Sequence, residues 1–183
     1  MHSVCFPAGS VISIQFDIGD DPYAVHCSNP VKGCYKESLR TGFFQLTTST
    51  RLEQQFEIHL PTSRKNPRIK SGDKVVFRSV HRPTRWFDCS SEDDCTITEC
   101  QNNAADPSNS SYITDCGDHL FRIFAVGRNA GTAVRTSDQI QFKHVNDSSY
   151  LNCLGKKCAL VENTCTSEGD SCLPQKLMLE KIQ

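Results

Sequence analysis

Cysteine and histidine are the residue types of this chain best suited to chemistry, and the chain has 11 cysteines and 6 histidines among 183 residues. Zinc sites gather such residues, often as Cys-x-x-Cys, but no Cys-x-x-Cys occurs here and the histidines are scattered. The sequence also lacks a Gly-x-Ser-x-Gly turn, a phosphate-binding glycine loop and a dinucleotide motif. We therefore expect no catalytic residue, no metal site and no cofactor, and we do not expect an enzyme.

Cysteines at this density without metal-ligand spacing are typical of proteins that fold outside the cytosol, where thiols are oxidised to disulfides. We therefore expect a secreted, extracellular protein. Two glycosylation sequons, at Asn109 and Asn146, lie in polar stretches that are typical of loops. The first seven residues lack the basic and apolar segments of a signal peptide, so we expect that a signal has been removed or that Met1 was added to the mature chain.

Charge and length exclude other classes of protein. The 20 Lys and Arg residues balance 21 Asp and Glu residues to a net charge of -1, whereas a general nucleic-acid binder needs a basic excess. No apolar run reaches the ~20 residues that span a bilayer, so no membrane insertion is expected. The length predicts a single domain.

One pattern occurs three times along the chain. Each copy opens with a turn and an alternating strand, at residues 8–14, 71–77 and 136–142. An apolar pair then precedes a cysteine, and a second cysteine soon follows, giving Cys27 and Cys34, Cys89 and Cys95, and Cys153 and Cys158. Each copy closes with an apolar-x-apolar segment, at 56–58, 121–123 and 177–179. Apolar side chains at every second position indicate half-buried strands, and only residues 174–183 are ambiguous with a helix.

The alternation also predicts which side chains face the core. The expected core positions are Ile12, Ile14, Val75, Phe77, Ile140 and Phe142, and the expected outward positions are Ser13, Val76 and Gln141. The position before the first cysteine of each copy varies in type, as His26, Asp88 and Asn152, so we expect it to face solvent. A short strand at Phe6 is expected to pair with residues 177–182, which would close the sheet without edges.

The threefold turn, the strand at residues 75–79, the aromatic-apolar pair before a cysteine (Trp86-Phe87 and Tyr150-Leu151) and the Phe-x-Ile strand resemble the β-trefoil superfamily over essentially the whole chain. The resemblance implies one all-β domain, residues 1–183, with repeats at approximately 1–65, 66–130 and 131–183. A sandwich of unrelated strands is the alternative. β-Trefoils serve as lectins, cytokines, protease inhibitors and cross-linkers, so the fold alone selects no function.

The repeats predict a disulfide framework. The two cysteines shared by all copies pair within each copy, as Cys27–Cys34, Cys89–Cys95 and Cys153–Cys158. Two further cysteines occur only in the second and third copies, and their joint absence from the first copy predicts the pairs Cys100–Cys116 and Cys165–Cys172. Cys5 is left over, either as a buried free thiol or as an interchain bridge that would support self-association.

Basic residues gather in residues 64–85 and acidic residues in 88–106. The candidate binding residues are Arg64, Lys65, Arg68, Arg82, Arg85 and Trp86. They predict a face for a polyanion or a complementary protein, in which Arg82 or Arg85 makes a cation–π contact with Trp86. The alternative is a pair of solvated loops.

The predicted function is non-enzymatic binding or scaffolding of another extracellular protein through the trefoil loops. The expected settings are an extracellular matrix or, in biomineralization, a mineral-associated filament. A carbohydrate-binding lectin is the second hypothesis: the Gln-x-Trp tryptophans of ricin-like trefoils are absent, but Tyr23, Trp86 and Tyr150 are of a type that stacks on sugars. A protease inhibitor is the third, since the chain resembles plant Kunitz trefoils in size.

Overall fold

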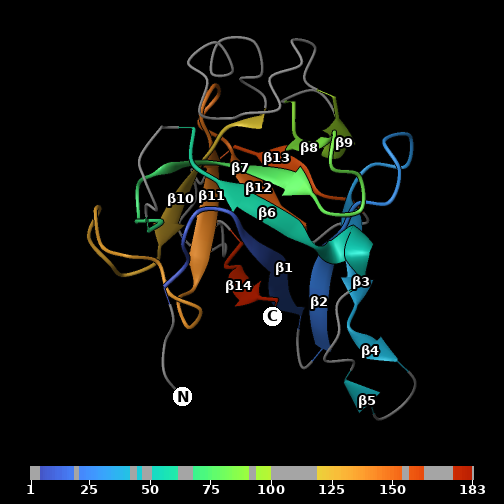
Figure 1. Cartoon of the computed structure of the whole chain (residues 1–183), viewed down its shortest axis with the longest axis horizontal. Coiled ribbons are helices and arrows are strands. Elements are labelled where there is room, and N and C mark those ends of the chain that lie inside the picture. Colours follow the sequence, from blue (N-terminus) through green and yellow to red (C-terminus); the bar gives the residue numbers. More distant parts are fainter. Residues whose placement is uncertain are drawn as a thin grey trace, which may run out of the picture.

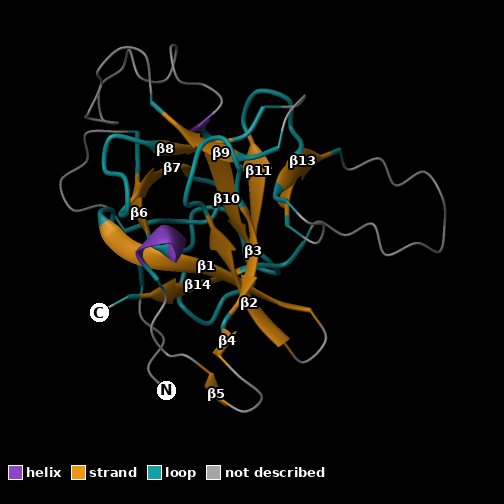
Figure 2. Ribbon diagram, turned by 90° about the vertical axis from the view of Figure 1, so that its right-hand side faces the viewer, coloured by secondary structure: helices purple, strands orange, loops and turns teal. Residues whose placement is uncertain are grey.

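The computed structural model describes residues 5–18, 21–41, 45–46, 51–61, 68–90, 94–99, 119–153, 157–162 and 175–182, and this part of the chain is all-β. Strands are the main regular element in Figure 2, and no α-helix occurs in the described ranges. The short 3-10 segment η1 (Leu52–Gln54) precedes one strand. No helix in these ranges is long and apolar enough to cross a membrane.

Six strands form a closed ring: β1 (Ser10–Ile18), β6 (Phe56–His59), β7 (Lys74–Ser79), β10 (Phe121–Ala125), β11 (Ile140–His144) and β14 (Met178–Lys181). Each strand pairs antiparallel with the next, from β1–β6 to β10–β11. Leu177 bridges to Ile140 of β11, and β14 then pairs with β1. The first and last strands of the ring therefore lie side by side (Figure 1), and the segment that was ambiguous in the sequence is a strand.

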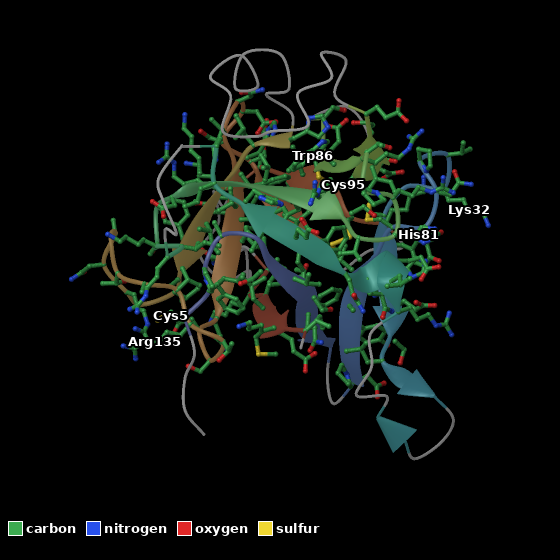
Figure 3. All side chains as sticks on the ribbon, in the orientation of Figure 1. Cys5, Lys32, His81, Trp86, Cys95 and Arg135 are labelled. Carbon is green, nitrogen blue, oxygen red and sulfur yellow. A yellow bond between two sulfur atoms is a disulfide. The ribbon has the colours of Figure 1, made fainter. Side chains whose placement is uncertain are left out.

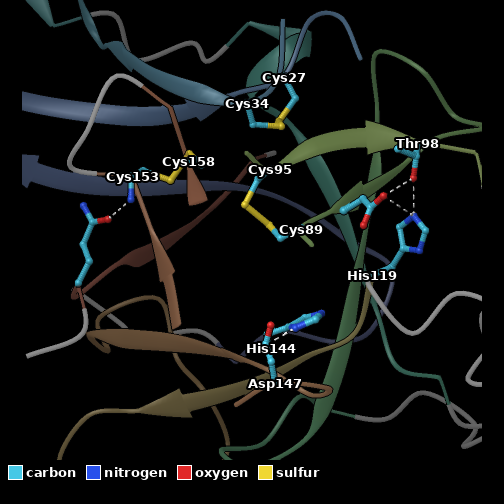
Figure 4. Close-up of a disulfide and its surroundings, with 12 residues drawn as sticks. Cys27, Cys34, Cys89, Cys95, Thr98, His119, His144, Asp147, Cys153 and Cys158 are labelled. Carbon is cyan, nitrogen blue, oxygen red and sulfur yellow. Dashed lines mark hydrogen bonds and ion pairs between the residues drawn. A yellow bond between two sulfur atoms is a disulfide. The ribbon is translucent and has the colours of Figure 1, made fainter. Parts of the chain in front are cut away.

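Three hairpins project from the ring after β1, β7 and β11: β2 (Asp21–His26) with β3 (Tyr35–Ser38), β8 (Trp86–Asp88) with β9 (Thr96–Thr98), and β12 (Tyr150–Asn152) with β13 (Ala159–Val161). A small separate ladder joins β4 (Arg40–Thr41) to β5 (Gln45–Leu46). Disulfides close the three hairpin loops at Cys27–Cys34, Cys89–Cys95 and Cys153–Cys158, which confirms three predicted pairs (Figure 4). Short loops between apolar strands leave the cysteines fully buried.

The second cysteines of the hairpins are joined by a triangle of backbone hydrogen bonds. The amide of Cys34 donates to the carbonyl of Cys95 at 2.6 Å, Cys95 to Cys158 at 2.7 Å, and Cys158 to Cys34 at 2.8 Å. We call this side of the ring the hairpin end. The triangle satisfies buried backbone groups that no strand partner reaches.

A second triangle closes the other end of the ring, where β1, β7 and β11 begin, and we call it the turn end. Phe6 donates to Val134 at 3.4 Å, Val134 to Ile69 at 2.9 Å, and Ile69 to Phe6 at 2.9 Å. The expectation that Phe6 pairs with residues 177–182 was therefore wrong. Both backbone groups of Phe6 are taken by the triangle, and the C-terminal strand pairs with β1 instead, from Ile12 to Gln15.

The core lies between the two triangles and is rich in phenylalanine. Phe77 contacts the rings of Phe87, Phe121 and Phe142, with centroids 5.0–6.3 Å apart. The six predicted core positions of β1, β7 and β11 are buried, as the alternation required. Ser13 and Val76 are buried too, contrary to the prediction, because these strands are covered on both faces. Gln141, by contrast, is only half-buried.

Candidate functional site

The structure does not bring the predicted basic site together. Arg68 lies at the turn end, bridged to Pro7. Arg82 and Arg85 follow β7 and lie at the hairpin end, where the Arg82 guanidinium is 3.4 Å from the Ser28 carbonyl and the Arg85 guanidinium is 3.2 Å from a Glu99 carboxylate oxygen. The six residues of β7 run between the two ends and span roughly 20 Å. Arg64 and Lys65 lie outside the described residues.

Trp86 is buried, with 3% of its surface exposed. The cation over its ring is Arg78, at 6.0 Å from the centroid, so the predicted contacts from Arg82 and Arg85 are replaced by one from the paired position on β7. His59 contacts the ring from its edge at 5.9 Å. Trp86 therefore supports the β7–β8 junction.

The other two aromatic residues named for sugar stacking have a lysine at the ring. The Lys36 ammonium lies 5.6 Å from the centroid of Tyr23, and the Lys143 ammonium lies 5.7 Å from that of Tyr150. A sugar ring would have to displace these lysines in order to stack there.

Cys5 forms no disulfide within the described residues and lies half-buried at the turn end, bridged to Arg135. The predicted pairs Cys100–Cys116 and Cys165–Cys172 lie outside the described residues. Of the two sequon asparagines, Asn109 also lies outside them. Asn146 is exposed in the turn between β11 and β12.

The position before the first cysteine of each copy was predicted to face solvent, but His26 is buried and Asp88 and Asn152 are half-buried. The ring of His26 is buried, with Nδ1 2.8 Å from a Glu37 oxygen. In the second copy the Thr98 hydroxyl lies 2.8 Å from both the Asp88 carboxylate and Nε2 of His119 (Figure 4). His26 and Asp88 thus face the second strand of their own hairpin, β3 and β9.

The Asp88, Thr98 and His119 cluster is not arranged as a nucleophile with an oriented base. The Asp88 carboxylate and the His119 ring both contact the Thr98 hydroxyl. The carboxylate also lies 4.0 Å from Nε2 of His119, the ring nitrogen that contacts the hydroxyl. A catalytic carboxylate would instead orient the far nitrogen of the base. In the described part of the chain, no group of three His, Cys, Asp or Glu side chains is placed to hold a metal ion.

Among the described residues, two carboxyl groups have pKa values below their ordinary values. Burial alone would raise the pKa of Glu57, but hydrogen bonds and charges from Arg78 and His59, each with a nitrogen 3.0 Å from Oε2, outweigh it. Burial also opposes the lowered pKa of Asp147, which the Ser149 amide at 2.9 Å and the His144 ring at 3.0 Å hold down. The Glu57 cluster stabilises the β6–β7 strand pair, and the Asp147 cluster stabilises the turn after β11.

A shallow cleft of about 320 Å³ lies beside β14. Its lining residues are Gln15, Thr136, Met178, Leu179, Glu180 and Lys181. The Gln15 amide donates to the Glu180 carboxylate across it, so its main polar groups already satisfy each other.

The feature that sequence reasoning missed is the loop inside the Cys27–Cys34 bridge. Asn29 accepts the amide of Val31 on its side chain at 2.9 Å and the amide of Lys32 on its carbonyl at 3.2 Å. The Thr96 hydroxyl donates to the Pro30 carbonyl at 2.7 Å. Val31 is 89% exposed at the tip, and Lys32 beside it is exposed too (Figure 3). The Asn-Pro turn signal inside a predicted disulfide could have found this loop.

Comparison with known proteins shows similarity in fold. No protein-family model and no curated relative matches the sequence. The crystal structure of the SDF2-like protein from Arabidopsis thaliana is similar, with a TM-score of 0.60 and 11% identity over 97% of this chain and 95% of that chain. A Caenorhabditis elegans protein of unknown function gives a TM-score of 0.57 and 11% identity over 97% of this chain and 96% of that chain. The chain is thus similar in fold to these proteins over nearly its whole length.

Proposed function

We propose that the chain is a secreted β-trefoil module without catalytic activity that binds another extracellular protein through its hairpin loops. The trefoil assignment is supported by the ring of strands, the three hairpins and the two triangles, each of which takes one member from each predicted repeat. The extracellular setting is supported by the three disulfides, which persist under oxidising conditions. An extracellular matrix or a mineral-associated filament stays the expected setting.

One observation carries the proposal: the most exposed large apolar side chain of the described residues, Val31, lies on a loop held by a disulfide and by three further constraints. A loop that is already ordered loses little conformational entropy when a partner binds. Removal of the valine side chain from water in a partner's pocket then contributes to affinity with little offset. The exposed Lys32 beside it favours a pocket with an acidic rim.

The test is capture of partners from the extracellular material of the source with three immobilised forms: the natural chain, Val31→Asp and Leu52→Asp. Leu52 is 54% exposed and lies outside the loop, so its substitution adds the same charge elsewhere. We expect a protein that is enriched at least tenfold by the natural chain and by Leu52→Asp, and lost with Val31→Asp. Equal enrichment by all three forms, or no enriched protein, would refute the hairpin-loop proposal.

A further inference from the structure

The turn end carries a set of cations that no single stretch of sequence contains. Two residues of each copy flank the triangle, and we call the six together the turn ring: Cys5, Pro7, Arg68, Lys70, Ala133 and Arg135. They pair across copies as Cys5–Arg135, Pro7–Arg68 and Lys70–Ala133. Figure 3 places Cys5 and Arg135 together, away from Trp86 and Lys32. The short bridges and the triangle hold Arg135 beside the segment that carries Arg68 and Lys70, although 65 positions separate Arg135 from Lys70 in the sequence.

All three cations of the turn ring are exposed. Among the described residues, no carboxylate forms an ion pair with the side chain of Arg68, Lys70 or Arg135. Surface cations of one sign that lie close together repel one another, and that repulsion is relieved when an anion binds. The ring therefore favours an anionic ligand.

The carboxylates nearest in sequence are already engaged with the backbone and with another arginine. Asp73 accepts the amide of Lys70 at 2.9 Å, and Asp138 accepts the amide of Arg135 at 2.9 Å. The other oxygen of Asp138, which is buried, lies 2.8 Å from the Arg128 guanidinium. These acids hold the turns in shape and keep their charges, but the four cations Arg68, Lys70, Arg128 and Arg135 outnumber the two carboxylates, so the surface stays net positive.

The shape of the turn ring selects the kind of anion. No exposed large apolar side chain lies in the ring, whereas protein interfaces depend on apolar or aromatic anchors at their centre. Arg68 and Lys70 lie on the second copy and Arg135 lies on the third, and all three side chains are exposed instead of converging in a pocket, so no small ion is enclosed. Guanidinium groups bind the oxygens of sulfate bidentately. A chain with sulfate groups spaced along it meets several of these cations at once.

We propose that the turn ring is a binding site for a sulfated polysaccharide. It lies at the opposite end of the molecule from the loop of Val31, and it shares with the proposed function only the extracellular setting. The module would then hold a polysaccharide at one end and a protein at the other.

The experiment measures binding of heparin, as the probe, to the full chain by calorimetry at two salt concentrations. The test variant is Arg68→Gln/Lys70→Gln/Arg135→Gln. The control variant, Lys32→Gln/Arg82→Gln/Arg85→Gln, removes the same net charge at the hairpin end. We expect the test variant to bind at least tenfold more weakly and with a smaller salt dependence, because fewer cations meet the ligand, and the control to bind within twofold of the natural chain.

Equal weakening of the two variants would show attraction by net charge alone, and no weakening of the test variant would show that the ring is not the site; either result overturns the proposal.

Desulfated heparin, polyglutamate and silica particles distinguish the ligand class. Binding of any of these as tightly as heparin would overturn the assignment to a sulfated polysaccharide. All substituted side chains are exposed or half-exposed, and disulfide mapping with a thermal transition verifies that each variant is folded. The Val31→Asp variant should bind heparin normally, which separates this result from the test of the hairpin loop.

Discussion

At the scale of single residues, Gly33 is a position at the hairpin end where a side chain would be strained. Its φ is +71°, and a Cβ there would lie 3.1 Å from the carbonyl oxygen of Cys95, an atom of the triangle that cannot move freely. Asp94 and Lys157 hold the same position in the other two copies and form an ion pair with each other. A Cβ at Gly33 would lie 3.8 Å from each of these two side chains, an ordinary contact, so the steric clash comes from the Cys95 carbonyl alone.

Gly33→Ala is therefore expected to lower the free energy of unfolding by about 2 kcal/mol, through strain at positive φ and the clash with Cys95. Chemical denaturation measures the change. Gly9→Ala is the control, since Gly9 has φ +83° with no atom within 4 Å of a Cβ, and it should cost only about 1 kcal/mol. Equal losses for the two variants would contradict the steric argument at Cys95.

Glu57 gives a prediction about pH. Its pKa in the folded state lies below the ordinary value of 4.5, so its ionised form contributes stability that is present above that value and lost as the pH falls through the folded pKa. Glu57→Gln should lower stability by about 1 kcal/mol at pH 7 and should match the natural chain in strong acid, where the carboxyl is protonated. Denaturation curves at a series of pH values test this.

Glu99→Gln is the matched control for Glu57. Glu99 also pairs with an arginine, Arg85, but its side chain is 63% exposed. Its substitution should change stability by less than about 0.5 kcal/mol at every pH, because water and salt screen the pair. Parallel pH curves for Glu57→Gln and the natural chain would exclude the role given to Glu57.

At the scale of elements, the strands that open each copy could be predicted because apolar and polar residues alternate along them, and the apolar positions are the ones that face the core. The hairpin disulfides followed from the repeat, and three are confirmed. The burial of Ser13 and of His26 could not be predicted. The alternation of apolar and polar residues predicts which side chains of a strand face the core. Whether the opposite face of the strand is also covered depends on contacts between segments that are far apart in the sequence.

The three disulfides should contribute alike. They close loops of similar length, with sequence separations of 7, 6 and 5 residues, so each should stabilise the fold by about 2 kcal/mol through the entropy of the unfolded chain. Three variants with one pair of cysteines replaced by alanine test this by denaturation. A loss confined to one hairpin would show that the copies are not equivalent.

At the scale of the whole molecule, the candidate sites could be predicted only in part. The sequence marked residues 64–85 as basic, but β7 carries Arg68 and Arg82 to opposite ends of the ring. The cations that do lie together, such as Lys70 and Arg135, are 65 positions apart, and only the backbone triangle shows that they are neighbours. Counting charges along the sequence cannot show that these two residues are neighbours in space.

Because the ring of strands is closed, its fold does not depend on where along the ring the chain begins and ends. A circular permutant that joins the ends through a flexible linker of about ten residues and opens between the exposed residues Asn129 and Ala130 should keep all three hairpin disulfides and unfold cooperatively. Opening within β6, between Glu57 and Ile58, should abolish folding, because it cuts a strand paired on both sides. Calorimetry and disulfide mapping compare the two. Failure of the first permutant would contradict the closure through β1 and β14.

Each triangle takes one amide and one carbonyl from every copy, and in the geometry of this ring the circuit closes after three copies. A fragment with a single copy leaves one donor and one acceptor unpaired at each triangle. Three such fragments restore both triangles in that geometry, so an excised copy that folds at all should assemble as a homotrimer.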